Sequence, residues 1–258
     1  MKSPQTAKSK PEAKSAPAKL AKSKAGQPQS QQPTAKQKVL VIDVGGTHVK
    51  MLATGQKTPL KFASGPEMTP SKMVAQVKQA VKNWSYDVIS LGYPGPIING
   101  HPLREPHNLG CGWVGFSFSK AFGVPVKIMN DAAMQAVGSY EGGRMLFLGL
   151  GTGLGAAMVV DGVLQPMELA HLSYKHGKTY EDYLGLRGLE HSGKKKWRKH
   201  VNKITEKLKV ELEADYVVLG GGNSKKLKEL PKGARLGNNA NAFVGGFRIW
   251  QKSAPQQI

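Results

Sequence analysis

Asp131 is the carboxylate of this chain that is best placed for acid–base chemistry. It follows the predicted strand 126–129 and Asn130, and alanines at 132, 133 and 136 indicate a helix that begins there. A carboxylate held where a buried strand meets a helix suits phosphoryl transfer to an alcohol, because the reaction needs a base that accepts the hydroxyl proton. An Asn-Asp pair before a helix is also a common N-cap, so capping is the alternative role for Asp131.

Three glycine-rich turns follow apolar runs that are typical of buried strands. They occupy residues 45–46, 151–155 and 220–222. Glycine has no Cβ, so the backbone N–H groups of such turns can approach the oxygens of a phosphate. None of the turns has the Walker A spacing or a good dinucleotide-binding pattern. We interpret them as candidate phosphate cradles, and a plain β-hairpin is the alternative for the first.

The first turn lies among side chains that suit phosphate and magnesium. Thr47 offers a hydroxyl donor, Lys50 a positive charge, and Asp43 a carboxylate that could hold a cation directly or through water. Proteins commonly hold Mg²⁺ with one or two carboxylates together with the phosphates of a substrate. We therefore expect Asp43 to help to place this metal.

Several polar residues lie in stretches that are otherwise apolar or rich in glycine. These residues are Asn108, Asn130, Glu168, His171 and Glu181. Carboxylates, amides and imidazole can pair with the hydroxyls of a sugar ring, and a site built in this way rejects analogues that lack a hydroxyl. Alternatively, Glu168 and His171 could be two metal ligands on one helical face, but the sequence offers no cysteine cluster to supply further ligands.

The elements that must position these residues alternate between strands and helices, which predicts an α/β fold. We expect strands at 38–54 on both sides of a glycine turn, and at 60–63, 88–91, 126–129, 145–150, 156–160 and 216–219. We expect helices after an N-cap at Thr69, at 116–122, after Asp131, from about Gly193, just after 222 and at 239–251.

The strand, glycine turn and strand of residues 145–160 repeat the unit at residues 43–52. Two copies of one device predict two lobes that face each other, with phosphates bound between them. We place the lobes at residues 38–130 and 131–258.

The formal net charge of the 258 residues is +20. Residues 1–38 hold nine lysines and one glutamate and contribute +8, while 28 basic and 16 acidic residues contribute +12 in the rest. A basic folded part suits a polyanion such as inorganic polyphosphate, a nucleic acid or an anionic membrane. A general effect on solubility is the alternative explanation.

Residues 1–37 are rich in Lys, Ala, Pro, Gln and Ser, and this composition predicts a disordered tail. No apolar run is long enough to span a membrane, and none follows the basic start as it would in a signal peptide. The single cysteine, Cys111, cannot form an internal disulfide. We therefore expect a cytoplasmic protein without a membrane segment.

Together these motifs resemble the ROK family of sugar kinases, within the actin and hexokinase-like superfamily. The resemblance covers about residues 38–250. The motifs that carry it are Asp43-x-Gly45-Gly46-Thr47-x-x-Lys50, Gly92-Tyr93-Pro94-Gly95, Asn130-Asp131, Gly151-Thr152-Gly153-Leu154-Gly155, Glu168-x-x-His171 and Gly220-Gly221-Gly222.

Within the family, the chain is similar to the polyphosphate glucokinase subgroup. The cysteine-rich zinc motif that many relatives carry after the position of His171 is absent. The region 177–200, with Glu181 and a long helix that bears a tryptophan, is similar to that subgroup, and so is the run Gly-Gly-Gly-x-Ser224-Lys225-Lys226.

The resemblance implies an actin-like, ribonuclease H-like fold of two α/β lobes with a central cleft, and transfer of a phosphoryl group to the 6-hydroxyl of glucose. It implies that Asp131 is the base, that Asp43 helps to place Mg²⁺, and that Asn108, Asn130, Glu168, His171 and Glu181 bind the sugar. The donor, polyphosphate or ATP, would be bound by Gly45, Gly46, Thr47, Lys50, Gly151, Thr152, Gly153, Gly221, Gly222 and Lys225. We also expect a homodimer.

The chain departs from the family at Ala170, where a glycine is usual, and at Tyr93, where threonine or phenylalanine is common before Pro-Gly. Tyr93 could alter the choice between glucose and another hexose. The alternative function is an ATP-dependent hexokinase of the same fold that acts on another sugar. A family repressor needs an N-terminal helix-turn-helix, which residues 1–37 do not provide, and specific nucleic-acid binding is not expected because Trp197 is alone in the basic run.

Overall fold

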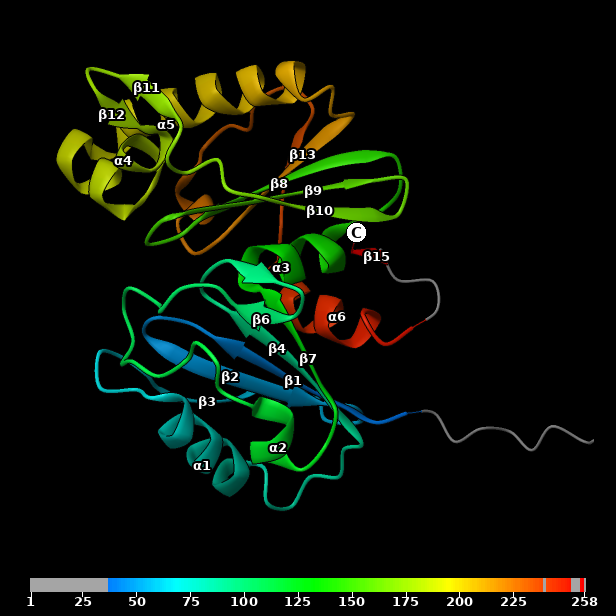
Figure 1. The fold of residues 1–258 in the computed structure, drawn as a ribbon. Helices are drawn as coiled ribbons and strands as arrows, with labels where there is room; N and C mark the ends of the chain where they lie inside the picture. Colours follow the sequence, from blue (N-terminus) through cyan, green and yellow to red (C-terminus); the bar gives the residue numbers. More distant parts are fainter. Residues whose placement is uncertain (1–36, 239, 252–255, 258) are drawn as a thin grey trace, which may run out of the picture. The chain divides into compact units, whose positions relative to one another are not determined.

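The computed structural model describes residues 37–238, 240–251 and 256–257, and two mixed β-sheets form the framework of this part (Figure 1). The expected disordered tail lies outside the described residues except for Gln37. No helix in the described part has both the length and the hydropathy that crossing a membrane would require.

The first sheet has the strand order β3-β2-β1-β4-β7. Its strands are β1 (Val39–Val44), β2 (His48–Ala53), β3 (Leu60–Ala63), β4 (Val88–Tyr93) and β7 (Val126–Asn130). β1 and β2 form an antiparallel hairpin across the first glycine turn, whereas β4 runs parallel to β1 and β7 runs parallel to β4. Every residue of β4 is buried, as expected for a parallel strand that is covered on both faces.

The second sheet repeats this arrangement with the order β14-β13-β8-β9-β10-β15. Its strands are β8 (Arg144–Leu150), β9 (Leu154–Val160), β10 (Val163–Met167), β13 (Tyr216–Gly220), β14 (Ala234–Leu236) and β15 (Gln256–Gln257). β8 and β9 again form an antiparallel hairpin across a glycine turn, and β13 and β14 continue the sheet in parallel. The unit that repeats in the sequence is therefore an antiparallel hairpin whose first strand also pairs with a parallel strand, β4 in the first sheet and β13 in the second.

Helices α1 (Pro70–Ala80) and α2 (Phe118–Phe122) cover one face of the first sheet (Figure 1). The predicted start of α1 is confirmed, since the Thr69 side chain accepts a hydrogen bond from the N–H of Lys72 and Pro70 is the first helical residue. The apolar side chains of α1 join one core with β1, β2 and β4.

Helices α3 (Asp131–Ser139) and α6 (Asn241–Arg248) pack against each other, and α3 contacts both sheets while α6 contacts β1 and β4 of the first. Gly138 of α3 and Gly245 of α6 allow this contact, because a Cβ at either position would overlap the backbone of the opposite helix. Val41 of β1 and Phe147 of β8 belong to the same buried cluster as these helices. α3 and α6 are thus the packed connection between the two sheets.

Helices α4 (Tyr180–Leu184) and α5 (Leu186–Glu211) share a core with the second sheet. The buried stripe of α5 contains Trp197, Val201, Ile204 and Leu208, as its periodicity predicted. α5 begins at Leu186, its backbone is broken at Gly193, where φ is 71°, and the helical part after this break is the helix that was predicted from about Gly193. The sequence pattern had therefore detected only the straight part of α5.

Short elements complete the fold. They are the hairpin of β5 (Ile97–Ile98) and β6 (His101–Pro102), the hairpin of β11 (Ser173–Lys175) and β12 (Lys178–Thr179), and the 3₁₀ turn η1 (Ser224–Lys226). η1 was expected as a short helix after the third glycine turn, whereas the two small hairpins were not predicted. Strands of two or three residues are too short to show an apolar periodicity.

Candidate functional site

Asn130, and not Asp131, is the N-cap of α3. The Asn130 Oδ1 accepts hydrogen bonds from the N–H groups of Ala132 and Ala133 at 3.0 and 3.1 Å, and its Nδ2 donates to the carbonyl of Gly95 at 3.0 Å. Asp131 is the first helical residue, and its Oδ1 accepts a hydrogen bond from the N–H of Ala132 at 2.8 Å. Asn130 therefore caps the helix, and the Asp131 Oδ2 forms no hydrogen bond within the described residues.

The pKa of the Asp131 carboxyl is raised to about 7. Burial is the main cause, and the nearby charge of Asp43 adds to it, while the hydrogen bond from Ala132 and the charge of Lys50 oppose the shift. A carboxylate with a pKa near neutrality is a suitable general base, because it is ionised in part and still holds a transferred proton firmly. A raised pKa also occurs in purely structural carboxylates, so the geometry around Asp131 has to support the role.

Asp43 is the carboxylate whose charge raises the pKa of Asp131. It lies near the end of β1, where it pairs in register with Lys50 of β2 and with Gly92 of β4. The Lys50 Nζ lies 3.3 Å from the Asp43 Oδ2. Burial raises the pKa of Asp43, and the charge of Lys50 and its hydrogen bond lower it. Two carboxylates and one ammonium group thus share this end of the first sheet.

The donor set at Asp43 fits a magnesium ion. Two mostly buried carboxylates with raised pKa values mark a place where a cation would relieve repulsion. Mg²⁺ needs only one or two protein carboxylates, because waters and phosphates complete its shell. No group of three His, Cys, Asp or Glu residues suited to a metal occurs in the described part of the chain. The alternative in which Glu168 and His171 bind a metal therefore lacks a third protein ligand.

The first glycine turn is braced on both sides. The N–H of Gly45 bonds the carbonyl of His48 at 3.0 Å, and the Ser64 hydroxyl donates to the carbonyl of Gly45 at 2.6 Å. Asn108, which is exposed, lies directly against Gly46. Within residues 37–238, the N–H groups of Gly46 and Thr47 meet no acceptor. The turn therefore presents two donors next to a predicted sugar-binding amide.

The second glycine turn is held by Glu181. The Glu181 Oε2 accepts a hydrogen bond from the N–H of Leu154 at 3.0 Å, and it fills the space that a Cβ of Gly153 would need. The N–H of Glu181 bonds the carbonyl of Ala170 at 3.0 Å, which ties α4 to the segment between Glu168 and His171. Thr152 and Gly153 keep N–H groups without an acceptor in the described residues. Glu181 therefore supports a donor turn, besides the sugar contact that was predicted.

The third glycine turn packs directly on the second. Gly221 has a φ of 78°, and a Cβ there would collide with the backbone of Leu150. The Asn223 N–H bonds the carbonyl of Leu150 at 2.9 Å, and its Nδ2 donates to the carbonyl of Gly151 at 2.9 Å. Asn223 is buried, and it is not among the residues predicted for the site. Its position directly after three glycines was the signal for it.

The start of α3 connects the two sets of groups. A Cβ on Gly155, just after the second turn, would lie 2.7 Å from the Cβ of Ala132. A Cβ on Gly92 would lie 3.6 Å from the Asp43 Oδ1 and would collide with the Met134 side chain. The first turn of α3 therefore contacts the second glycine hairpin, and its third residue after Asp131 approaches the end of β4.

Three predicted residues have no such contacts among the described residues. Glu168 and His171 are exposed, and neither side chain forms a hydrogen bond there. Residues 168–171 form an irregular segment rather than a helix, so the alternative of two metal ligands on one helical face is wrong. Lys225 in η1 is also exposed. The structure thus leaves these three side chains at the surface.

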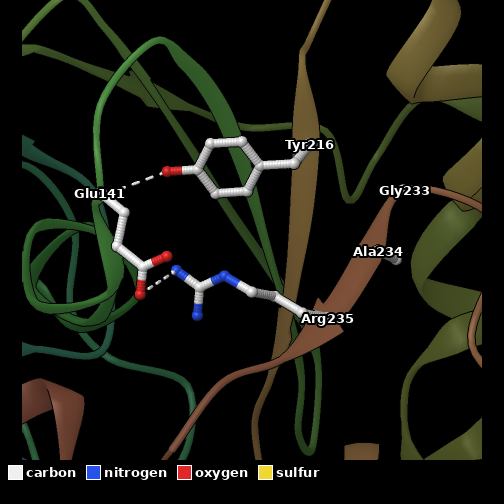
Figure 2. Close-up of a pocket in the computed structure, with 5 residues that line it drawn as sticks. All are labelled: Glu141, Tyr216, Gly233, Ala234 and Arg235. Carbon is white, nitrogen blue, oxygen red and sulfur yellow. Dashed lines mark hydrogen bonds and ion pairs between the residues drawn. The ribbon is translucent and has the colours of Figure 1, made fainter.

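A pocket lined by Glu141, Tyr216, Gly233, Ala234 and Arg235 lies elsewhere and contains no predicted site residue (Figure 2). In it the Arg235 guanidinium lies 3.1 Å from the Glu141 carboxylate and faces the ring of Tyr216. Arg235 is thus already neutralised within the chain. We interpret this pocket as a structural feature of the end of the second sheet.

Comparison with known proteins gives a consistent result. Residues 39–166 match the ROK family. The chain is 27% identical over 207 residues to the polyphosphate glucokinase of Mycobacterium tuberculosis, a match that spans 72% of this chain and 77% of that protein. Among solved structures it is similar to the inorganic polyphosphate/ATP-glucomannokinase of Arthrobacter sp. strain KM, with a TM-score of 0.72, 21% identity and coverage of 82% of this chain and 97% of that one. It is also similar to a ROK glucokinase from Streptomyces griseus in complex with glucose and AMPPNP, with a TM-score of 0.62, 14% identity and coverage of 81% and 97%. The predicted actin-like α/β fold is therefore confirmed.

Proposed function

Because the chain belongs to the ROK family of sugar kinases, we propose that it transfers a phosphoryl group from inorganic polyphosphate to the 6-hydroxyl of glucose, giving glucose 6-phosphate. We include ATP as a second donor. The observation that carries this proposal is the Asp131 carboxyl with a pKa of about 7, fixed at the start of α3 beside Asp43 and Lys50.

In this proposal Asp131 is the catalytic base. Its Oδ1 is fixed by the N–H of Ala132, so the Oδ2 accepts the proton of the sugar hydroxyl as the oxygen attacks the terminal phosphorus of the donor. The positive end of the α3 dipole stabilises the carboxylate before the proton is transferred. The donor leaves one phosphate shorter, and the base then returns its proton to water.

The glycine turns hold the donor in this proposal. The N–H groups of Gly46, Thr47, Thr152 and Gly153 point to phosphate oxygens, and Lys50 adds a positive charge. Gly45, Gly151, Gly221, Gly222 and Lys225 belong to the same donor site. A bound Mg²⁺ near Asp43 would offset charge on the transferred group.

The sugar is held in this proposal by Asn108, Asn130, Glu168, His171 and Glu181. Asn108 lies against Gly46, and Glu181 bonds to the turn that contains Gly153. Residues of the sugar site therefore contact the turns of the donor site. Glu168 and His171 would complete the sugar site from the segment tied to Glu181 through Ala170.

The choice of polyphosphate is supported by the similarity to the M. tuberculosis polyphosphate glucokinase and by the basic charge of the folded part. We further propose that the lobes divide at residue 130, and that the protein is a cytoplasmic homodimer. An ATP-dependent hexokinase with another sugar is the second candidate, because Tyr93 departs from the family pattern.

The decisive experiment measures glucose 6-phosphate production in a coupled assay with pure long-chain polyphosphate and, separately, with pure ATP. We expect turnover with both and a higher kcat/KM with polyphosphate. Turnover with ATP alone would assign the second candidate. Mannose offered in place of glucose tests the choice of sugar in the same assay.

A further inference from the structure

We propose that the phosphates of a polyphosphate donor that lie beyond the transferred group bind along a basic surface formed by Lys194, Lys195, Arg198, Lys225 and Lys226. We name it the η1–α5 surface. The inference rests on the proposed function and specifies where the rest of a long donor lies. It predicts that this surface sets the preference for chain length.

The η1–α5 surface begins at the glycine turns. The Asn223 Nδ2 donates to the carbonyl of Gly151 at 2.9 Å, and the Asn223 Oδ1 accepts from the Lys226 Nζ at 2.6 Å. One amide side chain thus connects the second turn to Lys226, the last residue of η1. A chain of phosphates that leaves the turn meets Lys226 and the exposed Lys225 next.

The surface continues from η1 onto α5. The Arg198 Nε donates to the carbonyl of Lys226 at 2.6 Å, which fixes this face of α5 against η1. Lys194 and Lys195 precede Arg198 by four and three positions, so they lie on the same face of the helix. Both are exposed. The second glycine turn is therefore linked to this face of α5 by three hydrogen bonds, through Asn223, Lys226 and Arg198.

The charges of the η1–α5 surface are free to attract an anion. In the described part of the chain none of its five basic side chains forms an ion pair. Lys194 and Lys195 also stand where α5 resumes after its break at Gly193, and positive side chains are unfavourable near a helix N-terminus. Helix stability therefore does not explain their position.

The surface suits a polyphosphate better than a nucleic acid. Proteins that bind single strands stack bases on exposed aromatic rings. The aromatic residue of this run, Trp197, is fully buried, and its Nε1 donates to the carbonyl of Leu184 at 2.9 Å. An anion without bases fits a surface that offers charge and no stacking platform.

The test compares two double variants of the full chain with the same change in charge. K194Q/K195Q alters the proposed surface, and K203Q/K207Q removes two exposed lysines from another face of α5. The assay measures KM for long-chain polyphosphate, tripolyphosphate and ATP at fixed ionic strength. We expect K194Q/K195Q to raise KM for the long chain about three- to tenfold and to weaken its dependence on salt, with kcat and both short donors unchanged. K203Q/K207Q should behave as wild type.

Other outcomes separate the inference from the function it rests on. Equal effects of the two double variants, or an equal rise of KM for tripolyphosphate, would overturn the η1–α5 surface while leaving polyphosphate as the donor. Wild type that uses ATP and no polyphosphate would overturn the proposed donor itself. A shift of single-stranded RNA that K194Q/K195Q abolishes, with unchanged KM for polyphosphate, would assign the surface to nucleic acid and reject the inference.

Discussion

The carboxylates of Asp43 and Asp131 belong to different elements, β1 and α3, yet they titrate as neighbours. Burial, and after it the charge of Asp43, raises the pKa of Asp131 to about 7. Lys50 lies 3.3 Å from Asp43 and lowers the pKa of both carboxyls. Asp43 and Lys50 lie on the hairpin of the first sheet, and Asp131 lies on the helix that connects the two sheets. Because Asp43 raises the pKa of Asp131 and Lys50 lowers it, substitutions of the two residues should shift this pKa in opposite directions.

Replacing the proposed base tests its role directly. Asp131→Asn keeps the size of the side chain and an acceptor for the N–H of Ala132, but it cannot take a proton. We expect kcat to fall about 10²- to 10⁴-fold while the Kd for glucose changes little. Single-turnover assays and calorimetric titration of glucose measure the two quantities. Near-normal turnover would show that the base is assigned wrongly.

The pH profile of wild type should show this ionisation. The base must be charged to act, so kcat/KM should fall about tenfold for each pH unit below a midpoint near 7. Asp43→Asn removes a charge that raises the pKa of Asp131 and should move the midpoint of the residual activity to lower pH. Lys50→Gln removes a charge that lowers it and should move the midpoint up. Shifts of the midpoint in the same direction would contradict the opposite effects of Asp43 and Lys50 on the pKa of Asp131.

Stability should depend on pH through the same group. The pKa of Asp131 is about 7 in the folded chain and near 3.8 in the unfolded one, so its contribution to stability is present below pH 4 and is lost as pH rises through 7. Asp131→Asn has no such loss. Its Tm relative to wild type should therefore rise between pH 5 and pH 8, by roughly 2–4 °C for each 1 kcal/mol involved. A Tm difference that is constant with pH would show that the carboxyl is not shifted.

Sequence patterns predicted the elements that depend on local chemistry. The hairpin of β1 and β2, the cap at Thr69 and the repeated unit at β8 and β9 follow from apolar runs, glycine turns and a capping residue. The small hairpins and the part of α5 before Gly193 were not found, because short strands have no periodicity and Gly193 interrupts the helical pattern.

The site was predictable in its residues but not in its contacts. Asn130 and Asp131 are both plausible caps from sequence, and only the bonds to Ala132 and Ala133 assign the cap to Asn130. The bridge from Asn223 to Gly151 joins residues far apart in the chain, so no local pattern announces it. Glu181 was expected to bind sugar, and its bond to Leu154 depends on how α4 packs against the second sheet.

Gly153 tests whether Glu181 controls the second turn. A Cβ at Gly153 would collide with the Glu181 carboxylate, so Gly153→Ala should push it away from the N–H of Leu154. We expect a loss in kcat/KM of about tenfold or more. In a Glu181→Ala background the same substitution should cost much less, because the collision partner is gone. A double-mutant cycle measures this coupling. Additive effects would show that the collision is not the cause.

Tyr93 is the residue through which we expect the chain to tune its sugar site. It is fully buried at the end of β4, and it pairs in register with Asn130 of β7. Its hydroxyl donates to the carbonyl of Arg104 at 2.7 Å, which ties β4 to the segment that carries Asn108. Burial, and then the charge of Glu105, raises the pKa of Tyr93, so the hydroxyl remains a donor at neutral pH.

Tyr93→Phe removes this tie and keeps the ring that packs on Trp113. The segment with Asn108 should then be held less firmly, so we expect KM for glucose to rise about three- to tenfold with little change in KM for the donor or in kcat. Tyr140→Phe is the matched control, because it removes a hydroxyl that bonds backbone groups of Gly143, just before β8, and Gly162, between β9 and β10. Equal changes in both variants would mean that loss of a tyrosine hydroxyl acts through general stability. A rise confined to Tyr93→Phe, together with a changed ratio of glucose to mannose turnover, would make Tyr93 a positioning residue for the sugar.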